Sequence, residues 1–222
     1  MPRKKRHRES EHYAPIERFL RRRFGCFVTA QDRGTRFGRV DVIGLRDIGG
    51  ELSGAFEIIA VEVKAGNQPF NTATGQAYGY SVYAERCYLA DLRDGTEPFS
   101  LDEIDIASRL GVGLLAIRPS GRVADILASP RGAPLVRMRA KIIERLGYSQ
   151  CVICGSAFQR GDAKQFFKHV SRDIAKAVKE EKGFVYWLHD IDARKRQGYF
   201  YTYERRCMCR NCVGNLFGKG SP

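Results

Sequence analysis

The chain has 222 residues, enough for one large domain or for one domain with a small attachment. Hydrophobic residues make up 43% of it, so a substantial core can be buried and global disorder is excluded. Lysine and arginine number 38 against 25 acidic residues, and the formal net charge is +13. This charge favours a polyanionic partner, in the first place nucleic acid, although an anionic membrane surface or an acidic protein fits it too.

No apolar run approaches the roughly 18 residues that a membrane helix needs, and the basic N-terminus lacks the apolar segment of a secretory signal. With 7 cysteines and no export signal, the chain is expected to hold reduced thiols or metal ligands and not a disulfide framework. We therefore expect a cytoplasmic, nucleoid-associated protein, or a nuclear one if the host has a nucleus, with no membrane partner.

The spacing of apolar residues predicts an α/β domain. Residues 1–10 are a basic arm with nothing to bury and are expected to be disordered. The following elements are expected in the order helix, three strands, helix, strand, helix, strand, which is typical of a central mixed sheet flanked by helices. The helices are expected at 11–24, 74–84 and 101–110, and the strands at 26–30, 38–45, 56–64, 86–90 and 113–117, with a further strand at 122–128.

The segment Ser129–Pro134 is the predicted boundary of this domain, which is expected to span residues 11–130. Residues 131–150 are expected to contain a connecting helix over Leu135–Leu146. From Cys151 onward cysteines cluster, the strand periodicity thins and basic residues become more frequent. Residues 151–222 are therefore expected to form a second, small module.

Three charged residues lie on the second and third predicted strands. Side chains two apart on a strand share a face, so Glu62 and Lys64 point together while Val61 and Val63 point to the opposite side. Asp41 lies among apolar neighbours on the preceding strand, where an ionised carboxylate is costly unless it is paired or bound to a metal. If the two strands are neighbours, Asp41, Glu62 and Lys64 converge on one point.

Two carboxylates supply the hard oxygen ligands that Mg²⁺ prefers. A lysine beside them can position an attacking water or help to deprotonate it, and can offset the charge that grows on a phosphorane. The alternative is that Glu62 and Lys64 form a surface pair on an edge strand and that Asp41 belongs to a turn.

The sequence Gly38-Arg39-Val40-Asp41, followed by Glu62-Val63-Lys64 and by Gln76-Ala77-Tyr78-Gly79-Tyr80, resembles the PD-(D/E)XK nuclease superfamily. This superfamily includes restriction endonucleases, archaeal Holliday-junction resolvases and RecB-type nuclease domains. The aspartate, the ExK motif and the element order match its general pattern, and Gln76-x-x-x-Tyr80 matches the QxxxY motif of RecB-like and lambda-exonuclease-like members. The resemblance covers about residues 11–128. It implies a restriction-endonuclease-like core and a phosphodiesterase in which Asp41 and Glu62 bind Mg²⁺ (or Mn²⁺) and Lys64 is the catalytic lysine.

The resemblance also implies a role for Glu17 on the first predicted helix. Members of the superfamily often carry an acidic residue there, which assists the metal or braces the site. Some RecB-like members have a histidine instead, so Glu17 favours the resolvase and restriction-enzyme branches. The alternative is an exposed ion pair with Arg21, four residues further along the helix.

In the predicted helix 74–84, Gln76, Tyr80 and Tyr83 fall on one face. Gln76 and Tyr80 beside the ExK strand can hold the scissile phosphate or a base; a tyrosine-bearing core face is the alternative. Gly75 and Gly79 line a neighbouring face and are expected to let the helix pack closely on the sheet.

Two CxxC units, about fifty residues apart, can supply four thiolates to one tetrahedral Zn²⁺. Gly155 follows the first unit, as a tight turn favours. The predicted zinc ligands are Cys151, Cys154, Cys209 and Cys212.

An iron–sulfur cluster is the alternative to zinc, because some RecB-like nucleases carry one and Cys207 offers a fifth thiol. Those relatives draw one cysteine from before the nuclease core, where Cys26 lies. However, Cys26 and Cys87 lie in apolar strands and are expected to be small core residues.

Between the CxxC units, the helix predicted at 161–183 carries a basic residue every three or four positions, and a predicted hairpin has a basic turn. Both features suit a phosphate backbone, although a solvated face explains the helix nearly as well. The expected nucleic-acid-binding residues are Lys164, Lys168, Arg172, Lys176, Arg194, Lys195 and Arg196.

Together these features predict a Mg²⁺-dependent DNA endonuclease of restriction, repair or junction-resolving type, with a small C-terminal zinc-binding module that grips DNA. Two alternatives stay open: a catalytically idle nuclease fold that binds DNA through its zinc module, and an RNA-processing nuclease. DNA is the expected partner, and homodimerisation is left open.

Overall fold

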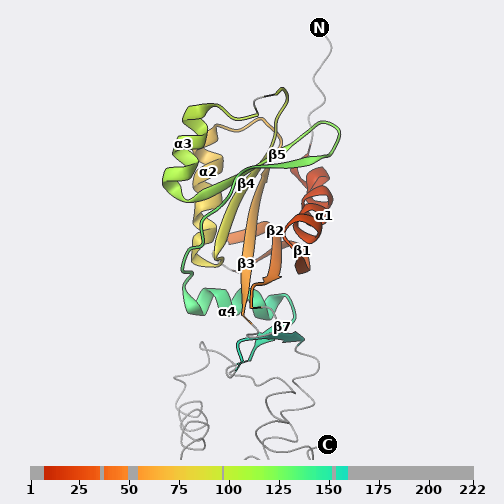
Figure 1. Ribbon diagram of the computed structural model, residues 1–222, viewed down its shortest axis with the longest axis vertical. Helices are drawn as coiled ribbons and strands as arrows, with labels where there is room; N and C mark the ends of the chain where they lie inside the picture. Colours follow the sequence, from red (N-terminus) through yellow and green to blue (C-terminus); the bar gives the residue numbers. More distant parts are fainter. Residues whose placement is uncertain (1–7, 36–37, 50–54, 97, 152–153, 160–222) are drawn as a thin grey trace, which may run out of the picture. The chain divides into compact units, whose positions relative to one another are not determined.

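The computed structural model describes residues 8–35, 38–49, 55–96, 98–151 and 154–159. The chain divides into two compact units, one of residues 1–49 and 56–142 and the other of residues 50–55 and 143–222. In the first unit, helices flank a six-stranded sheet with the order β1-β2-β3-β4-β5-β6 (Figure 1). The prediction of an α/β domain with a central mixed sheet is confirmed.

Neighbouring strands in this sheet run in both directions. β1, β2 and β3 pair antiparallel, β3, β4 and β5 pair parallel, and β6 pairs antiparallel with β5. In the second unit, β7 (Tyr148–Gln150) pairs antiparallel with β8 (Ala157–Gln159). The other elements are η1 (Glu9–His12), α1 (Tyr13–Arg23), β1 (Cys26–Thr35), β2 (Gly38–Asp47), β3 (Phe56–Lys64), α2 (Phe70–Gly79), η2 (Tyr80–Val82), β4 (Arg86–Leu92), α3 (Leu101–Leu110), β5 (Val112–Ile117), β6 (Val123–Leu127) and α4 (Val136–Arg145).

Most elements lie near their predicted positions, and two differences change the site. Glu9 and Ser10 belong to η1 and not to a disordered arm, of which residues 1–7 lie outside the described part of the chain. α2 begins at Phe70, four residues before the predicted start, and ends at Gly79. Its early start follows Pro69, whose φ of -59° already suits a helix entrance.

Apolar side chains fill both faces of the sheet. On one face, α1 places Ile16 and Leu20 over Val61 and Val63 of β3. On the other, α2 and α3 contribute Ala73, Ala77 and Ala107, which pack with Leu89 and Leu114. Burial of a leucine, isoleucine or valine side chain in this core stabilises the fold by about 1.5–3 kcal/mol. β3 therefore runs through the centre of the domain, and its polar side chains are held in fixed positions.

The two strand cysteines are buried, as predicted: Cys26 and Cys87 are each 5% exposed. Helix α1 crosses β2 at Gly44, where an added Cβ would lie 2.7 Å from the Cys26 sulfur of β1 and 3.3 Å from Leu20 Cδ1 of α1. The absence of a side chain at Gly44 thus lets the helix lie close to the strand. None of the helices in the described segments is long and apolar enough to cross a membrane.

Candidate active site

Glu62 and Lys64 lie on a central strand. β3 is hydrogen-bonded to β2 on one side and to β4 on the other, and Glu62 and Lys64 are 5% and 4% exposed. The Lys64 Nζ atom lies 2.5 Å from Glu62 Oε1. The alternative of a surface pair on an edge strand is therefore wrong.

Asp41 lies on β2, next to this pair. Val42 is opposite Val61 in the β2–β3 register, which brings Asp41 to the level of Glu62. The Asp41 Oδ2 atom accepts a hydrogen bond of 2.8 Å from the backbone amide of Val63, the residue between Glu62 and Lys64. Asp41 is thus a strand residue and not a turn residue, and the three predicted side chains are brought together.

Two tyrosines each hold one of the carboxylates. The Tyr13 hydroxyl, at the start of α1, donates to Asp41 Oδ1 at 2.9 Å. The Tyr80 hydroxyl contacts Glu62 Oε2 and also lies 2.8 Å from the carbonyl oxygen of Arg39. Burial raises the pKa of both phenols, and Asp41 beside Tyr13 and Glu62 beside Tyr80 raise it further. Both tyrosines therefore stay protonated and act as donors.

Burial raises the pKa of Glu62; the hydrogen bonds from Lys64 and Tyr80 counteract this shift, and the charge of Asp41 adds to it. Burial lowers the pKa of Lys64, but Glu62 and Glu9 outweigh it, so that the net shift is upward. Lys64 is accordingly an ammonium ion. Its positive charge offsets the negative charges of Glu62 and Glu9.

Glu9 is a site residue that the sequence did not reveal. It lies in η1, and its Oε1 atom is 3.4 Å from Lys64 Nζ. The signal that could have found it is the pair of acids, Glu9 and Glu11, directly before an apolar helical pattern, which is common at helix starts. Tyr13 follows the apolar spacing of the helix, and this spacing does not reveal the contact of its hydroxyl with Asp41.

Glu17 does not join the cluster. Its Oε2 atom accepts a hydrogen bond of 2.6 Å from Gln31 Nε2 on β1. Arg21, its expected alternative partner, donates instead to Thr29 Oγ1 at 2.8 Å. The polar side chains of β1 run beside this flank of α1 and offer both residues a partner, which a helical wheel cannot show.

The three residues predicted to share one face of the second helix do not share one environment. Gln76 is exposed, whereas Tyr80 and Tyr83 are buried, because the α-helix ends at Gly79 and continues as the tighter turn η2. The expectation that Gly75 and Gly79 pack closely on the sheet is wrong, since a Cβ at either position would meet nothing within 4 Å.

The donor set suits a hard divalent cation that also binds substrate. Among the described residues, no three His, Cys, Asp or Glu side chains are grouped as a ready metal cage. Mg²⁺ commonly binds through one or two carboxylates and completes its shell with water and phosphate oxygens. The two carboxylates of Asp41 and Glu62 fit that pattern.

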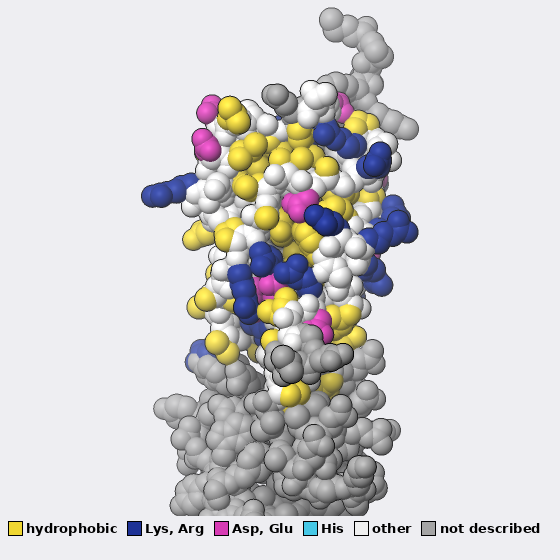
Figure 2. All heavy atoms as spheres, viewed as in Figure 1, with side chains coloured by type: hydrophobic (Ala, Val, Ile, Leu, Met, Phe, Trp, Pro, Cys, Tyr) yellow, Lys and Arg dark blue, Asp and Glu magenta, His cyan; other side chains and the backbone are white. Residues whose placement is uncertain are grey.

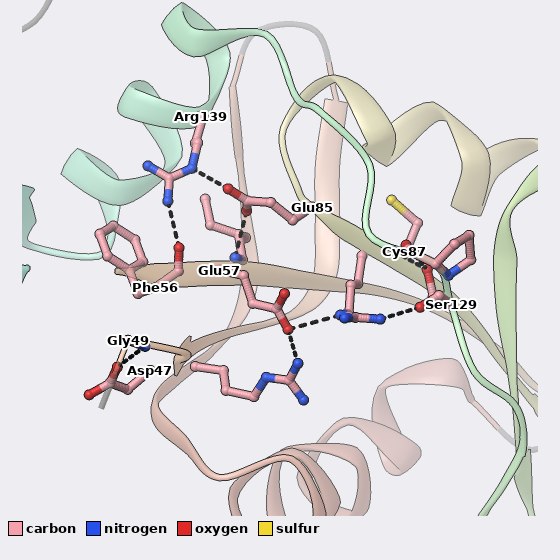
Figure 3. A network of polar contacts seen from close by, with 12 residues as sticks. Asp47, Gly49, Phe56, Glu57, Glu85, Cys87, Ser129 and Arg139 are labelled. Atoms are coloured by element: carbon pink, nitrogen blue, oxygen red, sulfur yellow. Dashed lines mark hydrogen bonds and ion pairs between the residues drawn. The ribbon is translucent and has the colours of Figure 1, made fainter. Parts of the chain in front are cut away.

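A second polar network lies at the other end of β3 (Figure 3). Glu57 pairs with Arg46 and Arg86, and Glu85 pairs with Arg139 of α4. Here two acids meet three arginines. The network ties the beginnings of β3 and β4 to the end of β2 and to α4, and its excess of positive charge disfavours a bound cation.

Part of the predicted zinc site is described in the second unit. The backbone amide of Gly155 donates to the carbonyl of Cys151 at 2.9 Å, and Gly155 has a φ of 76°, as a tight turn requires. The Cys154 sulfur lies 2.9 Å from Ser156 Oγ. Outside the described residues lie Cys207, Cys209, Cys212, Lys164, Lys168, Arg172, Lys176, Arg194, Lys195 and Arg196.

The sequence matches no protein-family model and no curated protein. The structure is similar to that of a protein of unknown function from Silicibacter pomeroyi, with a TM-score of 0.45 and 19% sequence identity. The match covers 80% of this chain and 97% of that chain.

Proposed function

We propose that residues 11–130 form a metal-dependent nuclease domain of the PD-(D/E)XK type, with a restriction-endonuclease-like fold, and that it cleaves DNA. The observation that carries this proposal is the junction of β2 and β3. There Glu62 lies 2.5 Å from Lys64, and Asp41 is hydrogen-bonded to the amide of Val63 between them. The net charge of +13 suits a DNA substrate.

The balance of charge at the two ends of β3 supports a cation site. At the far end, two acids are met by three arginines, which is the composition of a structural network. At the candidate site, Lys64 is the one cation that is paired with Glu62 and Glu9 among the described residues, and Asp41 lies beside them. Glu62 is buried with Lys64, whereas Asp41 is half-buried and Glu9 is 34% exposed. Like charges that lie close together repel each other, so an excess of carboxylates around one lysine favours a bound cation.

Each residue of the cluster has a chemical part in this proposal. Mg²⁺ held by Asp41 and Glu62 would polarise the scissile phosphate and lower the pKa of the attacking water. Lys64 offsets the negative charge that grows on the phosphorane oxygens. Tyr13 and Tyr80 orient the two carboxylates. Attack of water on phosphorus breaks its bond to the 3′ oxygen and leaves a 5′-phosphate and a 3′-hydroxyl.

The proposal includes a zinc-binding module at residues 151–222 that contributes to DNA binding. The turn Cys151–Gly155 is the support for it within the described residues. Structural Zn²⁺ would stabilise this module by linking its two CxxC units, with the ligands Cys151, Cys154, Cys209 and Cys212.

The test is incubation of the full chain with plasmid, with linear double- and single-stranded DNA and with RNA, with Mg²⁺ present or simply omitted. Asp41→Asn and Lys64→Ala should each lower DNA cleavage by at least roughly 10²-fold, the typical loss for a charge-stabilising group. Asp105→Asn is the matched control, because Asp105 lies exposed on α3.

Three outcomes would contradict the proposal. Near-normal turnover of Lys64→Ala in Mg²⁺ would remove its catalytic role. DNA binding without cleavage by the wild type would favour an idle nuclease fold. Cleavage of RNA alone would favour an RNA-processing enzyme.

A further inference from the structure

The outer face of α1, which we define as Ala14, Arg18, Arg21 and Arg22, is exposed and strongly basic. Figure 2 shows Lys and Arg side chains gathered over this side of the domain, at the right of the view. The opposite face of α1 carries Ile16 and Leu20, which are fully buried in the core. The helix is therefore fixed against the sheet and presents its arginines on a rigid element.

The arginines are not explained by pairing within the protein. Among the described residues, the side chains of Arg18 and Arg22 take part in no hydrogen bond or ion pair. They are four positions apart on the helix, where two like charges repel each other and destabilise it. The helix dipole favours cations in the last turn, which accounts for Arg22 but not for Arg18 in the middle of α1.

The same helix reaches the candidate site. Its first residue, Tyr13, donates to Asp41, so the beginning of α1 meets the carboxylate cluster. The arginines follow further along the helix, whose inner face packs on Val61 and Val63. With a rise of about 1.5 Å per residue, Arg18 and Arg22 lie roughly 8 and 14 Å along the helix axis from Tyr13. Each strand of a DNA duplex carries one negative charge per about 3.4 Å of the duplex axis, so a strand that runs along α1 presents about four phosphates over this span.

We propose that the outer face of α1 binds the sugar–phosphate backbone of a DNA duplex and guides the scissile strand to Asp41, Glu62 and Lys64. The outward positions carry no aromatic side chain on which the bases of a single strand would stack, which favours a duplex. This inference rests on the proposed function. It assigns to the first unit a DNA contact that is separate from residues 151–222.

The test measures the binding of a short fluorescein-labelled duplex to the full chain over a salt series, with Mg²⁺ omitted so that no cleavage occurs. The variant is Arg18→Gln/Arg22→Gln. The matched control is Arg109→Gln/Arg131→Gln, which removes two exposed arginines near the beginnings of β4 and β5, at the other end of the sheet. Thermal unfolding of both variants checks that the fold is unchanged.

The slope of log K against log salt should fall by roughly two in Arg18→Gln/Arg22→Gln, about one for each lost phosphate contact, and by the same amount for any duplex sequence. The control should keep the wild-type slope. An unchanged slope in the α1 variant, an equal fall in both variants, or an effect confined to single-stranded DNA would overturn the inference.

These results separate the two proposals. If the wild type cleaves DNA and the α1 variant keeps its slope, the inference fails and the nuclease function stands. If the duplex binds through α1 but is never cleaved with Mg²⁺, the nuclease function fails and the binding surface stands.

Discussion

The hydroxyl of Tyr13 donates a 2.9 Å hydrogen bond to Asp41, a residue 28 positions further along the chain. Tyr13 is the first residue of α1, while Asp41 lies on β2, next to the Glu62–Lys64 pair. The contact ties the helix on one side of the sheet to the carboxylate cluster. It makes the orientation of Asp41 depend on a residue outside the motif.

Tyr13→Phe removes only this hydroxyl and should loosen Asp41. Loss of a side chain that orients a metal ligand typically costs roughly 10–100-fold in metal affinity or activity. We expect a loss in this range in calorimetric Mg²⁺ titration, with a fall of about 1 kcal/mol in the free energy of unfolding. Tyr78→Phe is the control, because Tyr78 is 50% exposed. Equal Mg²⁺ affinity in both variants would show that Tyr13 does not position Asp41.

Substitutions of Tyr80 and Gln76 should have different effects on DNA cleavage, although both residues belong to the QxxxY motif. Tyr80 is buried against Glu62, so Tyr80→Phe should lower turnover by roughly 10–100-fold. Gln76 is exposed, so Gln76→Ala should change the free energy of unfolding by less than about 0.5 kcal/mol and raise KM for DNA with kcat little changed. Steady-state kinetics and thermal unfolding of the two variants decide between them. A fall in kcat for Gln76→Ala equal to that for Tyr80→Phe would contradict this division.

The Glu85–Arg139 pair should matter for stability and not for cleavage. Arg139 lies 2.5 Å from Glu85, which also accepts the amide of Ile58 at 2.7 Å (Figure 3). Arg139→Met would leave a buried carboxylate unpaired and should lower the free energy of unfolding by about 3–5 kcal/mol. The double variant Glu85→Gln/Arg139→Met should recover part of this loss, because a glutamine oxygen can still accept the Ile58 amide. Denaturant unfolding measures both, and a single variant as stable as the wild type would refute the prediction.

The purified chain should hold one tightly bound Zn²⁺. Four thiolates from Cys151, Cys154, Cys209 and Cys212 would form a closed tetrahedral site. Elemental analysis should find about one zinc per chain, and Cys209→Ser should lose it while Cys87→Ser, at a buried core position, should keep it. Iron with visible absorption would favour the cluster alternative. Absence of any metal would remove the predicted module.

Much of the fold follows from local sequence patterns. The helix α3 has its predicted bounds because Ser100 and Glu103 form a reciprocal capping box at its start and Gly111, with a φ of 71°, ends it. β3 also has its predicted bounds. The alternation of side chains on a strand placed Glu62 and Lys64 together, and the register of β2 brought Asp41 to them.

The rest of the site was decided by tertiary structure. Periodicity states which face of an element is buried, but not which side chains of another element lie against it. Glu17 was expected at the metal and lies against Gln31, whereas Glu9, expected in a disordered arm, contacts Lys64. The sequence by itself determined the positions of most helices and strands and the shared face of Glu62 and Lys64, because these depend on local hydrophobic patterning. The pairing of β2 with β3, which brings Asp41 to them, is tertiary. The crossing of α1 over β2 decided that Tyr13 holds Asp41, because contacts between distant segments depend on helix placement, which no local pattern encodes.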